Sequence, residues 1–530
     1  MDSTHPARAA ALTLSALLML AATGCHSSGG TCESSALCDA GSFCFEGRCV
    51  TGLPAGSCPS PTDPVLGALA GPTTAPACVQ SDPTTWPKPV TPFPSGWANH
   101  VGVFGVGQQV PFDVPPGTAS VTLHAQGVSA APAFDYQGCS LPNSVVPTAL
   151  RAPNGSLVYS DAEKAPRQGT RLPGYYGGYT PWTGSFTLPA TERLLDFAMS
   201  RGDLPAGTWS FQVNDWNAEC QAIAGCSPGV AGSYDVTVVN KPGPYLASGR
   251  LDLAVYLVGT GTDAAAAAAS APYRRFVKGI RSLLGQAGVC LGAVTFHDVA
   301  AWAQTAFSTT RIYIPAPCPA TADLRANQPP CGDDLAQLFS LARRDVDGAH
   351  LFLVQNLAVV CGKDVDPSYK CNIGGSIVGI DGSIPGPSGI PGATTSGAAM
   401  SGAEITNERV DDFGTVIGTC SDADPFDLHC LADFSAYIAA HEIGHWLGLY
   451  HTTESSGSQF DPLGDTATCS CATCGGRGCG VSPMFPSACS AGSSCGGGDN
   501  LMFWVVDPSA SEGRLTVQQG LLMRANPAVK

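Results

Sequence analysis

The sequence has few charged residues, and basic residues are the scarcer kind. Asp, Glu, Lys and Arg make up only 13% of the 530 residues, and 26 Lys and Arg stand against 42 Asp and Glu, for a formal net charge of -16. Because nucleic-acid binding needs a basic face, this balance argues against a nucleic-acid partner. Hydrophobic residues form 44% of the chain, which indicates a globular protein rather than a disordered or coiled-coil one.

Long hydrophobic runs are also scarce, and the one near the start is too short to span a membrane with its flanks. It extends from Ala9 to Ala22 after the basic Arg8, a pattern typical of a signal peptide over residues 1–25. The ending, Ala22 to Cys25, resembles the lipobox of bacterial lipoproteins. That resemblance implies lipidation of Cys25, a lipid anchor in the membrane, and a location outside the cytoplasm at the outer membrane or cell surface. Plain secretion is the alternative.

The cysteine count points to the same kind of compartment. The chain has 23 Cys, and lipidation of Cys25 leaves an even number suited to disulfides. Residues 26–50 are poor in apolar sequence and therefore predict a small disulfide knot, which serves either as a spacer or as a binding module. Residues 51–97 are rich in Pro, Thr and Ser and predict a linker without regular structure, with one clip between Cys58 and Cys78. The four cysteines of the knot are Cys32, Cys38, Cys44 and Cys49.

Short alternating apolar runs recur between Gly and Pro turns from residue 98 to residue 243. A period of two is the pattern of strands with one buried face, so this multidomain chain is predicted to carry a β-sandwich accessory domain here. Its role is either binding of a substrate or surface, or passive spacing. The expected strands are Gln109 to Val114, Ala119 to Ala125, Thr208 to Val213 and Tyr234 to Val239.

The remaining chain alternates strand-like and helix-like segments, which predicts an α/β (α+β) domain over residues 248–530. Pro272 suits a first helical turn, and acidic residues begin the second predicted helix while basic ones end it. The expected strands are Leu251 to Val258, Val289 to Phe296 and His350 to Val360, and the expected helices are Tyr273 to Leu284 and Asp333 to Arg344.

One motif within this domain carries chemistry: His441 to His451 satisfies HExxHxxGxxH at every fixed position. Residues four apart share a helix face, so His441 and His445 can present imidazoles to one Zn²⁺. Glu442 lies beside the metal without binding it, where it can act as the general base toward a zinc-activated water.

The sequence around the motif supports this geometry. Phe434 to Ala440 contains no Gly or Pro, so a helix can continue into the motif. Gly448 can adopt the positive φ that ends a helix, which lets the chain turn and bring His451 round as third ligand. Three protein ligands leave an open position, as in catalytic rather than structural zinc sites.

At these residues the chain resembles the metzincin clan of zinc metalloendopeptidases. The resemblance implies a metzincin-type catalytic domain, with a helical zinc site under a cleft and a Met-turn below it. Met502, within Asp499 to Trp504, is the predicted Met-turn methionine, and Met484 is the alternative. Within the clan the chain looks most like the pappalysin group, on the phrases Gly448 to Thr452 and Asp461 to Thr466 and a closing helix within Leu515 to Arg524.

Other candidate ligands have simpler explanations. Cys469, Cys471, Cys474 and Cys479 resemble a zinc cluster, but an oxidising compartment favours disulfides with Cys489 and Cys495. Cys420 and Cys430 are expected to form a clip before the motif helix. Asp461 and Asp465 suit either Ca²⁺ or an ordinary turn, and His297 and His350 are expected to be packed or surface residues.

The sequence therefore predicts a secreted or lipid-anchored zinc metalloendopeptidase that hydrolyses polypeptide substrates as a monomer. The alternative, from another class, is a surface binding protein or adhesin that keeps a metzincin scaffold without catalysis. Glu442 favours the enzyme, because a binding protein has no use for a general base beside the metal.

Overall fold

The computed structural model describes most of the chain from residue 98 onward and short segments before it. The described residues are 42–45, 48–51, 65–68, 98–127, 133–136, 139–142, 144–160, 183–199, 201–216, 233–313, 334–343, 345–360, 378–390, 393, 395–470, 484–489 and 496–530. The signal peptide with Cys25 and the expected Cys58 to Cys78 clip lie outside these residues. No helix in the described part is both long and apolar enough to cross a membrane.

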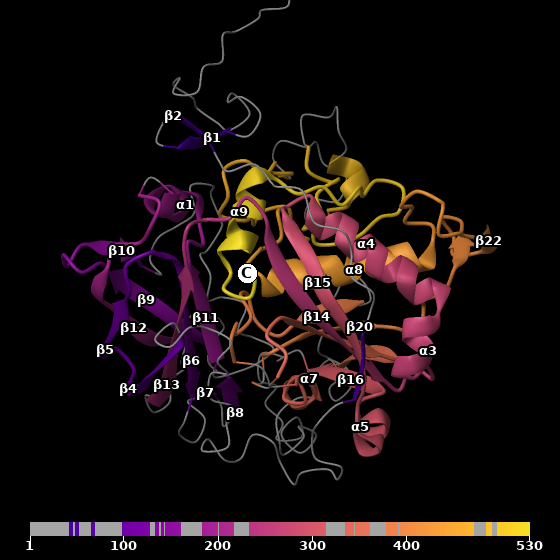
Figure 1. Ribbon diagram of the computed structural model, residues 1–530, viewed down its shortest axis with the longest axis horizontal. Coiled ribbons are helices and arrows are strands. Elements are labelled where there is room, and N and C mark those ends of the chain that lie inside the picture. The colour runs from indigo at the N-terminus through magenta and orange to yellow at the C-terminus, as the bar shows by residue number, and fades with distance from the viewer. Residues whose placement is uncertain are drawn as a thin grey trace, which may run out of the picture.

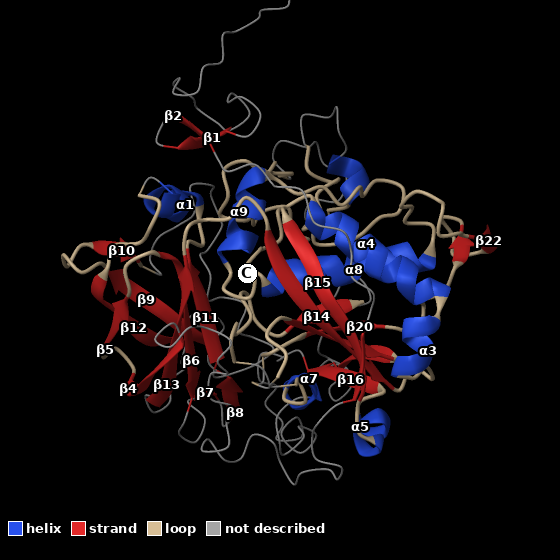
Figure 2. Ribbon diagram, in the orientation of Figure 1, coloured by secondary structure: helices blue, strands red, loops and turns tan. Residues whose placement is uncertain are grey.

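Two bodies lie side by side in Figure 1, one almost entirely of strands and one in which helices cover a sheet. Figure 2 shows the same division by secondary structure, with helix α1 (Glu192–Met199) beside the strands of the first body. The expectation of a β-rich unit followed by an α/β unit is confirmed.

The first body is a sandwich of two antiparallel sheets, each with four strands. Both sheets turn one face into a shared core that holds Trp209 and Phe211. The first sheet has the order β10 (Leu157–Tyr159), β9 (Ser144–Arg151), β12 (Gly207–Trp216) and β5 (Gln109–Val114). The second has the order β11 (Thr183–Leu188), β6 (Thr118–Gly127), β13 (Ser233–Pro242) and β4 (Ala98–Gly105).

All four strands predicted in this region are present. The reason is clearest in β5, where exposed and buried residues alternate along the whole strand. Val110, Phe112 and Val114 enter the core, and the residues between them face solvent. This period-2 pattern is what the sequence shows.

The second body is built on a six-stranded sheet that is parallel except at one edge. The edge strand β19 runs antiparallel to its neighbour β20. The order is β19 (Gly379–Asp381), β20 (Ala398–Ser401), β17 (Ala349–Val354), β14 (Gly249–Val258), β15 (Val289–Asp298) and β3 (Val65–Ala68).

Helices cover both faces of this sheet, and strand β14 shows how. Leu253, Val255 and Leu257 face one apolar cluster, whereas Tyr256 and Val258 face the other. The first cluster lies under α3 (Ala264–Ala269), α4 (Ala271–Gly285), α8 (Leu431–Trp446) and α9 (Val517–Ala525), and the second under α5 (Ala301–Ala306) and α7 (Asp334–Phe339). A strand buried on both faces reads as a continuous apolar run, which is the pattern of Leu253 to Val258.

Three expectations are wrong in part. The predicted linker contains β3, because four residues, Val65 to Ala68, suffice to pair with β15 at the sheet edge. The predicted helix over Asp333 to Arg344 is only α7 and ends at Phe339. The predicted strand His350 to Val360 is two strands: β17 ends at Val354, and β18 (Asn356–Val360) pairs instead with β16 (Thr309–Tyr313). Apolar content alone does not reveal that break.

The smaller elements of the described chain are two-stranded ribbons and a 3₁₀ turn. In the knot region the strands pair so that Cys44 lies opposite Cys49. The ribbons are β1 (Ser42–Phe45) with β2 (Arg48–Thr51), β7 (Ala133–Tyr136) with β8 (Cys139–Pro142), and β21 (Glu408–Val410) with β22 (Val416–Thr419), and the turn is η4 (Pro486–Cys489).

A buried polar junction joins the two bodies. Lys241, at the end of β13, donates from Nζ to the carbonyl oxygens of Arg524, Asn526 and Val529 near the C-terminus. On a neighbouring strand, the Ser120 hydroxyl donates to the carbonyl of Ala525. The sandwich therefore contacts the α/β body through specific hydrogen bonds, not through the connecting segment alone.

Candidate metal centre

Helix α8 carries the motif, and almost all of its residues are buried. A buried ion pair fixes its first turn: Arg275 on α4 lies 2.5 Å from the Asp433 carboxylate, with both side chains under 4% exposed. The helix ends as the sequence predicts, since Gly448 has a φ of +113°. A residue with a side chain is strained in that conformation, whereas glycine adopts it freely.

The three motif histidines converge on one point. The Nε2 atoms of His441 and His445 are 3.0 Å apart, and that of His451 lies 3.2 Å from the first and 3.1 Å from the second. Among the described residues this is the only group of three or more His, Cys, Asp or Glu side chains whose ligand atoms come so close together.

The opposite nitrogen of each ring is held by an acceptor. His441 Nδ1 lies 2.7 Å from the Leu501 carbonyl, and His445 Nδ1 lies 2.7 Å from the Leu449 carbonyl. Carbonyl oxygens only accept, so both Nδ1 atoms carry the proton and both Nε2 atoms keep a lone pair. His451 Nδ1 lies 3.0 Å from Oε1 of Glu454, which supports the same tautomer.

This arrangement fits a divalent metal ion. Lone pairs at this spacing repel one another, and a shared cation removes the repulsion. Tetrahedral Zn²⁺ with ligands at about 2.0 to 2.1 Å needs donors roughly 3.3 Å apart, close to the spacing found. Burial lowers the pKa of His441 to about 4 and those of His445 and His451 well below the usual value, with the neighbouring imidazoles adding to the effect at the last two. Neutral imidazole is the form that binds metal.

Glu442 lies beside the triad against the edge of the sheet. Its side chain packs on Gly379 of β19, where an added Cβ would lie 2.5 Å from Oε1. Burial raises the pKa of Glu442 well above its usual value, and the nearby Asp381 carboxylate raises it further. A raised proton affinity is what a general base requires, and Glu442 directly follows His441 on the helix.

Met502 lies under the motif helix. An added Cβ on Gly444 would be 2.7 Å from its sulfur, so this glycine is needed for the close contact. Leu501, its neighbour, supplies the carbonyl that orients His441. Met484 packs elsewhere, against the Cys469 to Cys489 disulfide. The structure thus brings Met502, and not Met484, to the triad.

The remaining predicted residues take structural roles. Cys420 and Cys430 form the expected disulfide, and Cys469 bonds to Cys489. Asp465 accepts from the Thr516 hydroxyl and the Gln518 N–H at the start of α9, and Asp461 accepts from Leu463 N–H and the Thr466 hydroxyl. These bonds are those of a turn and a helix cap, the alternative to Ca²⁺. The other four cysteines of this group lie outside the described residues.

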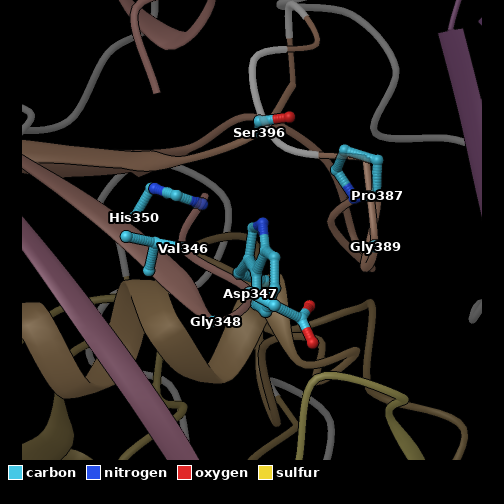
Figure 3. Close-up of a pocket in the computed structure, with 8 residues that line it drawn as sticks. Val346, Asp347, Gly348, His350, Pro387, Gly389 and Ser396 are labelled. Carbon is cyan, nitrogen blue, oxygen red and sulfur yellow. The ribbon is translucent and has the colours of Figure 1, made fainter. Parts of the chain in front are cut away.

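The histidines expected to be packed are buried, and neither lies at the triad. His350 hydrogen-bonds the Tyr256 hydroxyl at 2.9 Å, and His297 bonds Thr295 at 2.7 Å. His350 also lines a small pocket between β17 and the loop of Pro387 and Gly389 (Figure 3). Its volume of about 10 Å³ holds at most one water, so it is no substrate site.

Comparisons with known proteins add little to this geometry. The chain matches no known family model and no curated protein. Among solved structures it has a weak similarity to metalloproteinase-II from Bacteroides fragilis, with 10% identity over 44% of this chain and 60% of that chain, and a TM-score of 0.17. The match thus spans less than two thirds of that protein, and at this TM-score it supports no conclusion about fold or activity.

Sequence reasoning missed three residues that shape the site. Glu454 supports His451, Gly379 makes room for Glu442, and Asp381 faces Glu442. The only sequence signal was at Glu454, an acid three residues after the last histidine of the motif. Gly379 and Asp381 come from a strand more than 60 residues upstream, and no motif connects them to the helix.

Proposed function

We propose that the protein is a zinc metalloendopeptidase of the metzincin clan, closest to the pappalysin group. The observation that carries the proposal is the convergence of three Nε2 atoms from His441, His445 and His451. Glu442 is the buried residue that follows His441 on the same helix. The sequence resemblance supports the clan, through the motif, Gly448 and Met502. The antiparallel edge strand β19 next to α8 agrees with a cleft along the sheet edge.

In this proposal the three imidazoles hold the ion, and their Nδ1 partners keep each ring in the binding tautomer. Bound zinc supplies Lewis acidity, which acidifies water and polarises a peptide carbonyl. Glu442 accepts the proton of the attacking water and donates it to the leaving amine. The buried surroundings favour both proton transfers, because fewer solvent hydrogen bonds compete for the carboxyl group.

The location and partners belong to the same proposal. A lipid on Cys25 would anchor the enzyme outside the cytoplasm, at the outer membrane or cell surface, where its disulfides are stable. Polypeptides are the substrates, and the enzyme acts as a monomer. The metzincin-scaffold binding protein or adhesin is the competing function, and the placement of Glu442 at the triad speaks against it.

The deciding experiment compares the full exported chain with its Glu442→Ala variant. Both proteins should bind one equivalent of zinc, because Glu442 is not a ligand. Wild type should digest unfolded protein substrates, and the variant should lose at least about 10²-fold in turnover. If both bind zinc and neither cleaves any of a broad panel of substrates, the binding-protein function replaces the enzyme.

A further inference from the structure

Exposed apolar side chains gather on one ribbon of the α/β body. Seven large apolar residues of the described chain are strongly exposed, and three lie on the β21–β22 hairpin. Phe413 at its tip is 92% exposed, and Val416 and Ile417 on β22 are 55% and 61% exposed. Large apolar groups exposed side by side mark interaction sites more often than single exposed ones do.

The hairpin presents these side chains from a fixed backbone. At the tip, Oδ1 of Asp411 accepts from the N–H groups of Phe413 and Thr415 at 2.9 and 2.8 Å. At the base, the Cys420 to Cys430 disulfide ties β22 to the start of α8. A partner therefore meets a surface that is already ordered, so little conformational entropy is lost on binding.

One edge of the hairpin is open for strand addition. β22 pairs with β21 on one side, and no other described strand pairs with it. Every residue of Val416–Thr419 is exposed, and an added Cβ at Gly418 would meet nothing within 4 Å. An exposed strand edge of this kind accepts an extended polypeptide through backbone hydrogen bonds.

Charge selects among the possible occupants. From Glu404 to Cys430 the chain has seven carboxylates and one arginine. Arg409 already pairs with Asp427, and His429 contacts Asp412 and Asp427. A second copy of the hairpin would bring like charges together, and an anionic lipid surface would be repelled. A segment that alternates basic and apolar residues would satisfy both the carboxylates and the apolar side chains.

We propose that the β21–β22 hairpin is a docking site for a partner polypeptide, which adds a basic, apolar strand to the edge of β22 against Phe413 and Ile417. In Figure 1 the hairpin stands at the margin of the molecule opposite the sandwich. The hairpin adjoins the start of α8 through an isolated backbone β-bridge between Arg409 and Cys430. The triad begins further along the helix, at His441. Docking therefore does not depend on the proposed peptidase activity.

The test measures binding to the full chain carrying Glu442→Ala, so that no probe is cleaved. The probe is a fluorescent eight-residue peptide of alternating lysine and valine, followed by fluorescence anisotropy at several salt concentrations. We expect saturable binding that weakens with salt. Phe413→Ser with Ile417→Ser should weaken binding at least tenfold while every carboxylate stays in place. Phe413→Ser alone should weaken it in the same direction, and its tip position makes it a variant that folds.

Leu157→Ser is the matched control, because Leu157 is 50% exposed on a strand of the sandwich. Its affinity for the probe should equal that of the parent. A probe N-methylated at every second amide should bind at least tenfold more weakly, because it cannot form the ladder. Equal binding by the Phe413 variants would refute the docking site. So would Phe413-dependent sedimentation with phosphatidylglycerol vesicles, or Phe413-dependent dimerisation, since either result assigns the hairpin to another occupant.

Discussion

The Oε1 atom of Glu454 lies 3.0 Å from Nδ1 of His451, so a side chain orients the third imidazole while backbone carbonyls orient the other two. A backbone acceptor is fixed by the fold, whereas this carboxylate can be removed by mutation. His451 is also the ligand outside helix α8, after the turn at Gly448. The orientation of the His451 imidazole therefore depends on the Glu454 side chain, whereas the other two imidazoles depend on backbone carbonyls.

Replacing Glu454 with alanine should weaken zinc binding by about 10- to 100-fold, the usual cost of removing such a partner. Competition with a chelator of known affinity measures the change. Glu454→Gln is the control, because its amide oxygen can still accept from Nδ1. Equal affinities for wild type and the alanine variant would show that His451 is held by other contacts.

Gly379 should be essential for placing Glu442. A Cβ at this position would lie 2.5 Å from Oε1 of Glu442 and 2.8 Å from Cγ2 of Ile438, so alanine must push the carboxylate aside. A displacement near 1 Å costs on the order of 10² in turnover. We expect Gly379→Ala to lower kcat by about that factor with zinc content unchanged. Gly418→Ala, whose Cβ would meet nothing within 4 Å, should leave kcat unaltered.

The contrast between His441 and Gly379 shows what the sequence could predict. Ligand spacing is a local property of one helix, so HExxHxxGxxH predicts the triad, and alternating apolar residues predict strands such as β5. Gly379 reaches Glu442 only because β19 pairs antiparallel with β20 at the sheet edge. Such long-range pairing leaves no pattern within the strand itself, and for the same reason β3 was not foreseen.

Breaking the buried pair of Arg275 and Asp433 should strongly destabilise the fold. The two side chains are 2.5 Å apart and almost fully buried, so Arg275→Ala leaves a carboxylate without its cation. Removal of one partner of such a pair costs about 3–5 kcal/mol. Denaturant unfolding should show a loss of this size. The neighbouring Arg274 is half exposed and 3.9 Å from Asp422, and Arg274→Ala should cost under about 1 kcal/mol. Similar losses for the two variants would contradict the prediction.

The hairpin base should lose stability as the pH rises past neutrality. His429 lies 3.0 Å from carboxylate oxygens of both Asp412 and Asp427, and these bonds raise its pKa. Arg409 also binds Asp427 from the other side. Because the folded-state pKa is the higher one, the stabilisation is complete below about pH 6.5 and is lost as the pH rises through the folded value. The difference in melting temperature between wild type and His429→Gln should therefore shrink from pH 5.5 to pH 8. A constant difference would show that His429 keeps one charge state throughout.

Lys241 should hold the sandwich against the α/β body. Its Nζ donates to the carbonyls of Arg524, Asn526 and Val529, and the side chain is 4% exposed. Methionine keeps most of the volume but leaves buried acceptors without donors, at roughly 1–3 kcal/mol for each one that stays unsatisfied. We expect Lys241→Met to lower the free energy of unfolding by about 3 kcal/mol or more. The two bodies should then unfold in separate steps, as seen by calorimetry.

The matched control is Lys278, which donates to the exposed carbonyl of Asp422. The free energy of unfolding of Lys278→Met should stay within about 0.5 kcal/mol of wild type. A single cooperative transition of unchanged midpoint in Lys241→Met would mean that apolar packing, and not the lysine, joins the two bodies.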